Sequence, residues 1–581
     1  MPSEPSRNRP AAFVAIVAFT ALTCALSVGR GQPPNGAVKR RADVPAPTRR
    51  FISAKDCSRC HKPADLGGAP HFAGDPDQPR LVRFDESKVW SEVDKHSRAF
   101  DALTGRRGEA MGMLLGYKNI RVEPACLSCH STGFLPADSD EIRAEAVKSA
   151  DQGVNCAACH GSYLEWVANH GLTADQTRRW RLKTADEKSR AFGMTDLRDP
   201  ATRAGVCVSC HVGNASEGKV ITHAMYAAGH PPLPGIEVAT FLEAMPPHWA
   251  KPADVEAFQK DAGLRERNHV DFSEPQATKA VVVGAVVTLR DAMRLLASRA
   301  ESATAPAGEV FAAWPDYAQF DCYACHHDLQ APGFRRQRQM RGFDHRFDGA
   351  VVSGVAGRPQ FRPWTLALAG VALARADEAN KEEFRKAVKA LYAAFDARPF
   401  GDPAAVTRAA RRLEAWSEGM LVSIGRKKLD AGSPPEVLKA LASTPAEQLL
   451  DYDSSRQVAW ASKAVYADWT PKPANHDRFE AVLADLDLML KLDPHKSLKP
   501  RADAIAAQER AEGALRSELR ANAVAARERA DALRETLLKL SEDEFKVSIA
   551  RAADYDPDVF KEALGRLKSL MAEVPAAKPG P

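Results

Sequence analysis

The sequence predicts a mainly α protein, and two observations on its 581 residues lead to that prediction. From about residue 363 to residue 574, apolar residues recur at the spacing of amphipathic helices, and Ala, Leu, Glu, Arg and Lys dominate. Residues 51–350 are instead rich in Gly, Pro and His, which predicts short helices separated by long loops. We therefore expect a first domain of short helices and an α-helical C-terminal domain, residues 351–581.

The chain begins with the pattern of an export signal. Arg7 and Arg9 precede an uncharged, mostly apolar run from Ala11 to Gly29, and a Pro- and Gly-rich stretch follows. We favour a cleaved signal peptide over residues 1–30. The run of about 19 residues also suits an uncleaved membrane anchor, and Cys24 leaves a lipoprotein as a third interpretation. Each interpretation places the mature chain outside the cytoplasm, in the periplasm or an equivalent compartment, with or without a membrane anchor.

Five copies of one short motif contain ten of the 11 cysteines. In each copy two cysteines are separated by two residues and a histidine follows directly, which is the spacing that attaches c-type haem. The thiols form thioethers to the haem, and the imidazole ligates its iron. The attaching residues are Cys57, Cys60, Cys126, Cys129, Cys156, Cys159, Cys207, Cys210, Cys322 and Cys325, and the proximal ligands are His61, His130, His160, His211 and His326.

The alternative to haem at paired cysteines is a zinc or thioredoxin-like site. Neither requires a histidine directly after the second cysteine in every copy, so we expect five covalently bound haems over residues 51–350. The formal net charge is +5, but five haems add propionates worth roughly −10 if all are ionised. The basic sequence therefore does not predict a nucleic-acid partner. Residues 31–50 lack an apolar period and are expected to be a flexible linker.

Within residues 51–350, two longer helices are predicted. Ser87–Leu103 has Val89, Trp90, Val93 and Phe100 at helical spacing. Ala277–Ser302 is longer, leads toward the fifth motif and is expected to pack against haem. In the C-terminal domain, a charged helix is expected over Arg501–Leu540 and a last helix over Pro557–Val574. Breaks between its helices are expected near Pro399–Pro403, Gly432–Pro435, Pro471–Pro473 and Pro494–Pro500.

Eleven of the 16 histidines lie outside the motifs. His476 and His495 lie in the C-terminal domain, and we expect no haem role for them. The other nine lie before residue 350, among the motifs, and this clustering favours distal ligation of iron over ordinary surface positions. They are His71, His96, His170, His223, His230, His248, His269, His327 and His345.

From residue 51 to about residue 250 the sequence resembles the cytochrome c-554 family, and more broadly the relatives of hydroxylamine oxidoreductase. The first motif is followed by Val89–His96, in which a tryptophan precedes a histidine by six positions as in that family. Gly153–Gly161 reads GVNCAACHG, the family form of the third motif, and His170 lies ten residues beyond it. The fourth motif leads into Thr222–Pro231, a stretch typical of the wider group.

The resemblance implies distal histidines for three haems: His170 for the haem on His61, His96 for that on His211, and His230, with His223 as the alternative, for that on His160. It leaves the haem on His130 five-coordinate. The fifth motif lies outside the resemblance, and its sixth ligand stays open among His223, His327 and His345. Met111 and Met113 precede the second motif, and we favour apolar packing over iron ligation for both.

We expect an exported multihaem cytochrome c that transfers electrons between redox partner proteins, because histidine on both sides of iron suppresses substrate binding. The alternative is an oxidoreductase acting on a small nitrogen or oxygen species at an open His130 haem. A third hypothesis, a non-redox scaffold built on the C-terminal domain, is less favoured because five haems serve no purely structural purpose.

Overall fold

In a computed structural model of the chain, the described residues are 53–62, 82–134, 140–161, 166, 169–171, 173–267, 274–304, 314–326, 344–347, 350–353, 355, 358–490 and 555–574. The expected export signal with Cys24, the linker, the charged helix over residues 501–540 and the break near residues 494–500 lie outside them.

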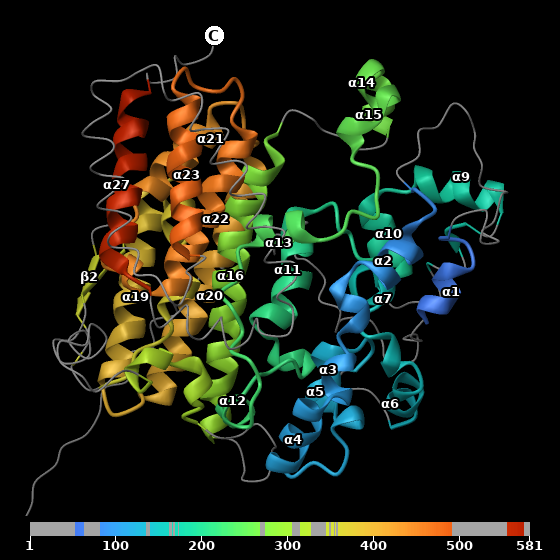
Figure 1. The fold of residues 1–581 in the computed structure, drawn as a ribbon, viewed down its shortest axis with the longest axis horizontal. Coiled ribbons are helices and arrows are strands. Elements are labelled where there is room, and N and C mark those ends of the chain that lie inside the picture. The colour runs from blue at the N-terminus through green and yellow to red at the C-terminus, as the bar shows by residue number, and fades with distance from the viewer. Residues whose placement is uncertain are drawn as a thin grey trace, which may run out of the picture. The chain divides into compact units, whose positions relative to one another are not determined.

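The described part of the chain is mainly helical, which confirms the predicted fold class (Figure 1). Two short strands, β1 (Asp344–Phe347) and β2 (Ala350–Ser353), form an antiparallel pair in which Asp344 lies opposite Ser353. Over the ranges given above, none of the helices combines the length and the apolar composition that crossing a bilayer requires.

The described residues up to Arg267 contribute short helices, as predicted. They are α1 (Ala54–Ser58), α2 (Glu86–Glu92), α3 (Asp101–Thr104), α4 (Arg106–Leu114), α5 (Pro124–His130), α6 (Asp140–Val147), α7 (Cys156–His160), α9 (Ala174–Leu182), α10 (Ala185–Phe192), α11 (Pro200–His211), α12 (His223–Ala227), α13 (Val238–Ala244), α14 (Glu256–Lys260) and α15 (Ala262–Arg267).

The single helix predicted over residues 87–103 is divided into three. Helix α2 ends at Glu92, the 3-10 helix η5 covers Lys95–Arg98, and α3 begins at Asp101. The break has a local cause, since the Asp94 carboxylate accepts a hydrogen bond from the backbone N–H of His96 at 3.0 Å and so caps η5. The same carboxylate contacts the imidazole of His96, so the break also orients that side chain.

The longer helices follow. They are α16 (Gln276–Glu301), α18 (Ala369–Leu373), α19 (Glu378–Asp396), α20 (Pro403–Arg426), α21 (Ser433–Ala442), α22 (Tyr452–Asp468), α23 (His476–Leu490) and α27 (Pro557–Glu573). Helices α16 and α27 lie within one residue of their predicted bounds, and the breaks predicted near Pro399–Pro403 and Pro471–Pro473 separate α19 from α20 and α22 from α23. Both breaks follow from proline, which cannot continue a helix.

Helix α16 is the central element of the main apolar core. Most of its 26 residues are buried, which is the pattern of a helix surrounded by protein. It contacts α20 and α22 and also α11, the helix that ends with the fourth motif (Figure 1). Its approach to α13 is close, because a Cβ on Gly284 would lie 2.6 Å from the Cβ of Val238. One continuous core therefore includes Val208 of the fourth motif and reaches α27.

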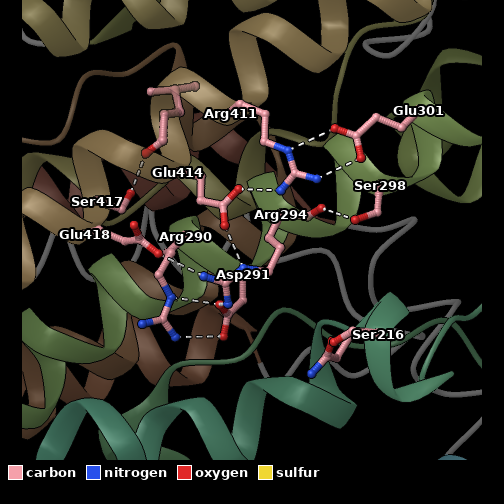
Figure 2. A network of polar contacts seen from close by, with 12 residues as sticks. Ser216, Arg290, Asp291, Arg294, Ser298, Glu301, Arg411, Glu414, Ser417 and Glu418 are labelled. Atoms are coloured by element: carbon pink, nitrogen blue, oxygen red, sulfur yellow. Dashed lines mark hydrogen bonds and ion pairs between the residues drawn. The ribbon is translucent and has the colours of Figure 1, made fainter. Parts of the chain in front are cut away.

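A network of ion pairs joins α16 to α20 (Figure 2). The Arg294 Nε donates to Glu414 at 2.7 Å, and Arg411 donates to the other oxygen of Glu414 at 2.7 Å. Arg411 also forms a bidentate pair with Glu301 at 3.0 and 2.8 Å, a geometry that fixes both side chains. Burial raises the pKa of Glu414, but the two arginines outweigh burial and hold it below its ordinary value.

Candidate haem sites

Each of the five motifs forms one helical turn. The second and third motifs lie in α5 and α7, the fourth ends α11, and the first begins in α1. In the first motif, the N–H of His61 donates to the carbonyl of Cys57 at 3.0 Å; in the fifth, His326 donates to Cys322 at 2.8 Å. A helical turn brings positions three and four apart to one face, so the two cysteines and the histidine of each motif share a side. The ten motif cysteines form no disulfide with one another.

A simple distance tests whether these sites fit a haem. A bond from a metal to an imidazole nitrogen is about 2 Å long, so two imidazoles on opposite sides of one iron have ring centroids about 6 Å apart. A ligating imidazole also donates its other ring N–H, commonly to a carbonyl or carboxylate, which orients the ring. The centroid distance is known at four motifs, and a partner of the second ring nitrogen is known for His61 and His130.

At the first motif, His61 faces His170. Their ring centroids are 6.1 Å apart and the rings are nearly parallel, at 9°. The Nδ1 of His61 lies 3.3 Å from the Glu86 carboxylate, so its Nε2 is the nitrogen that remains for iron. Trp166 and Trp180 pack against His170, with centroids 5.0 and 6.4 Å from it. The structure thus brings together the two histidines that the resemblance pairs, and a small aromatic cluster holds the distal one.

At the second motif, His130 faces His230, with centroids 6.2 Å apart. The Nδ1 of His130 lies 2.6 Å from the carbonyl of Ala99, and that of His230 lies 2.7 Å from the carbonyl of Pro231. Both rings therefore direct Nε2 away from the backbone. The resemblance paired His230 with His160 and left His130 without a distal partner. The structure differs on both points.

At the third motif, His160 faces His248, with centroids 6.4 Å apart. Burial lowers the pKa of His160 to about 4, so this imidazole is neutral at pH 7, as an iron ligand must be. The Nδ1 of His248 lies 3.4 Å from the carbonyl of Pro246. Sequence reasoning did not single out His248, because only its place among nine clustered histidines pointed to it.

At the fourth motif, His96 lies near His211, as the resemblance implies. Burial lowers the pKa of His211, and His96 lowers it further. The Nδ1 of His96 lies 2.9 Å from the Asp94 carboxylate, and this hydrogen bond raises the pKa of His96. Phe241 of α13 packs edge-on against His211 at 5.2 Å.

At the fifth motif, His326 faces His223, with centroids 6.3 Å apart. His223 begins α12, and Tyr317 packs against it at 5.5 Å. Of the other candidate ligands, His345 lies in β1. His71, His269 and His327 lie outside the described residues.

Cysteines of different motifs also contact one another. The Cys156 thiol donates to Cys57, which lowers the pKa of Cys57. The Cys129 thiol donates in the same way to Cys210. The attachment edges of the first and third sites are therefore adjacent, and so are those of the second and fourth.

The two methionines near the second motif have different surroundings. Met111 is buried in a small apolar cluster with Leu103, Ile120 and Leu127, as expected for packing. Met113 is 76% exposed.

Comparison with known proteins gives one matching family. The sequence profile of the cytochrome c554 and c-prime family matches residues 56–161, which carry the first three motifs and His96. The match supports a cytochrome c554-type assignment and confirms the resemblance over that stretch. It also identifies the protein's chemistry in general as electron transfer by covalently bound haem c. Neither the curated proteins nor the solved structures gave a match to the chain.

Proposed function

Because the chain carries a cytochrome c554-type haem segment, we propose that it is an exported five-haem cytochrome c that relays electrons between redox partner proteins. Residues 51–350 bear the haems, and the mature protein works outside the cytoplasm, in the periplasm. Residues 351–581 form an α-helical domain whose own role is separate from haem attachment. When bound, each haem supplies an iron that alternates between the ferric and ferrous states.

One observation carries this proposal: a second histidine faces the proximal one at four motifs, at centroid separations of 6.1–6.4 Å. At the fourth motif, His96 lies close to His211. Two imidazoles occupy both axial positions of an iron and leave none for a substrate. The geometry therefore supports six-coordinate iron at these four motifs, and the family resemblance supports it at the fourth motif.

The histidine pair at the second motif counts against the oxidoreductase alternative. This alternative requires an open position at the His130 haem, and His230 faces that position with its Nδ1 already engaged by a carbonyl. The adjacent thiols of the first and third motifs, and of the second and fourth, support close contact between haems, which fast electron transfer needs.

The test uses the full chain matured in a host that attaches haem c. A pyridine haemochrome assay with intact mass is expected to give five haems per chain, and the ferric protein is expected to give low-spin EPR signals only. Carbon monoxide is expected to leave the Soret band of the reduced protein unchanged. As the matched control, His230→Ala is expected to give one high-spin haem that binds carbon monoxide. Fewer than five haems, or carbon monoxide binding to the unchanged protein, would contradict the proposal.

A further inference from the structure

We infer that His223 is the distal ligand of the fifth haem. We also infer that the segment from His223 to His230 couples this haem to the second one, so that the fifth haem is part of the electron relay. The inference deepens the proposed function and rests on haem attachment at the fifth motif. That motif, Cys322–His326, lies well outside the family match to residues 56–161.

The geometry at the fifth motif is that of the other histidine pairs. The His223 and His326 rings are 6.3 Å apart and inclined by 30°. This separation equals the one expected, about 6 Å, for two imidazoles on a shared metal. Tyr317 packs edge-on against His223 at 5.5 Å and limits the rotation of its ring. Helix α12 contacts the 3-10 helix η11 (Tyr317–Gln319), which shortly precedes the fifth motif.

A buried ion pair fixes the backbone of His223. One oxygen of Asp316 accepts the backbone N–H of His223 at 3.1 Å and also that of Ala318 at 3.1 Å. The other oxygen pairs with Arg299 of α16 at 3.1 Å, and the two side chains are only 4% and 5% exposed. Asp316 thus bonds to three parts of the chain: α12, the loop before the fifth motif and the central helix α16. Arg299 and Asp316 are positioning residues for His223.

The same short segment carries the distal histidine of the second site. Helix α12 has five residues, so it is about 7.5 Å long at about 1.5 Å per residue. The chain then turns at Gly229, whose φ of +110° favours glycine, and reaches His230. Tyr226, between the two histidines, has its ring centroid 6.2 Å from that of His230. The distal histidines of the fifth and second sites therefore lie seven positions apart on one short segment.

The ligand is tested by His223→Ala in the holoprotein. We expect one haem of five to change from low to high spin in the ferric EPR spectrum and to bind carbon monoxide when reduced. The same substitution in a Cys322→Ser/Cys325→Ser background, which lacks the fifth haem, is expected to change no spin state. His476→Ala serves as the matched control, because this histidine lies on α23 and faces no motif histidine among the described residues.

If His223→Ala fails to accumulate, His223→Met keeps an iron ligand, and we expect one new sulfur-to-iron charge-transfer band. An unchanged spectrum in both variants, or a spin change that persists without the fifth haem, would overturn the assignment. Failure of the proposed function itself would appear differently, as fewer than five haems in the unchanged protein.

The link to the second haem is tested by removing the fifth haem and measuring potentials. In separate variants, His230→Ala marks the second haem as high spin and His170→Ala marks the first. Removal of the fifth haem is expected to shift the midpoint potential of the marked second haem and to leave that of the marked first haem unchanged. The reverse pattern, or no shift in either, would overturn the link.

Discussion

Asp94→Asn provides a direct test of how the protein sets the potential of its fourth haem. The Asp94 carboxylate is buried, at 5% exposure, and lies 2.9 Å from the Nδ1 of His96. A carboxylate in this position draws the proton of the ring and makes the imidazole a stronger donor to iron. Asparagine keeps the shape and a hydrogen-bonding oxygen but removes the charge. Ferric iron gains more from a strong donor than ferrous iron, so the substitution should raise the midpoint potential.

The size of the shift in midpoint potential follows from the hydrogen bond between Asp94 and His96. A bond to a charged group contributes about 1.5–3 kcal/mol and a neutral one about 0.5–1.5 kcal/mol, so the exchange costs about 1–1.5 kcal/mol. The His96 side chain is 42% exposed, and competing water moves the value toward the lower end. A tenfold change in an equilibrium, about 1.4 kcal/mol, equals about 59 mV for one electron. We therefore expect a rise of about 40–60 mV, nearer the lower value.

The assay is a spectroelectrochemical titration of the holoprotein with EPR on the same samples. The haem that moves is identified by His96→Ala, which should turn that same haem high spin. The control is Asp101→Asn on α3, an exposed carboxylate with no histidine contact among the described hydrogen bonds, which should leave every potential unchanged. A fall in potential, or an equal shift in the control, would refute the argument.

Three further predictions concern stability and ligation. Gly284→Ala should lower the free energy of unfolding by about 2 kcal/mol, because the added methyl group overpacks against Val238. Gly205→Ala in α11 is the comparison: its added Cβ would meet only the end of the Arg290 side chain, at 3.7 Å, so it should be neutral or stabilising by up to about 1 kcal/mol. Denaturant titrations of both variants measure the difference. The pKa of Glu414 is lower in the folded than in the unfolded chain, so ionised Glu414 stabilises the fold. This stabilisation is complete above the unfolded pKa of about 4.3 and is lost as the pH falls through the folded pKa. The free energy of unfolding, measured between pH 7 and pH 3, should show this loss in the natural protein and not in Glu414→Gln. His170→Ala should convert one low-spin haem to high spin in the EPR spectrum, and an unchanged spectrum would remove His170 from the ligands.

Local patterns predicted the local structure well. The continuous apolar spacing of residues 277–302 gave α16 within a residue at each end, because a helix buried on all sides needs little from its surroundings to define it. The proline clusters predicted the ends of α19 and α22, because proline cannot continue a helix. By contrast, the pattern over residues 87–103 carried the correct apolar spacing but missed the break at Asp94. There, a side chain that caps η5 and holds His96 outweighs the apolar period.

The haem sites were likewise predictable from sequence only in part. The proximal half of each haem site is encoded within five consecutive residues, so the sequence alone predicts all five attachment points. The distal half comes from elsewhere in the chain: His248 reaches the third motif from 88 positions beyond His160, and His223 reaches the fifth from 103 positions before His326. No local spacing encodes such pairs. Only the family resemblance could suggest them, and the last stretch that carries it ends at Pro231, before His248 and the fifth motif.

The departure at the second motif has a consequence for function. If His230 served the third haem, the second iron would be open, and the chain would hold one site for chemistry. In the structure, His248 faces the third motif, which leaves His230 to face His130. The presence of one additional histidine, on the loop after α13, thus decides whether the second site is open or closed. Replacing His248 alone should therefore open the third haem and leave the second six-coordinate. A carbon monoxide complex at the second haem of His248→Ala would mean that His230 moves between the two sites and that its pairing with His130 is not fixed.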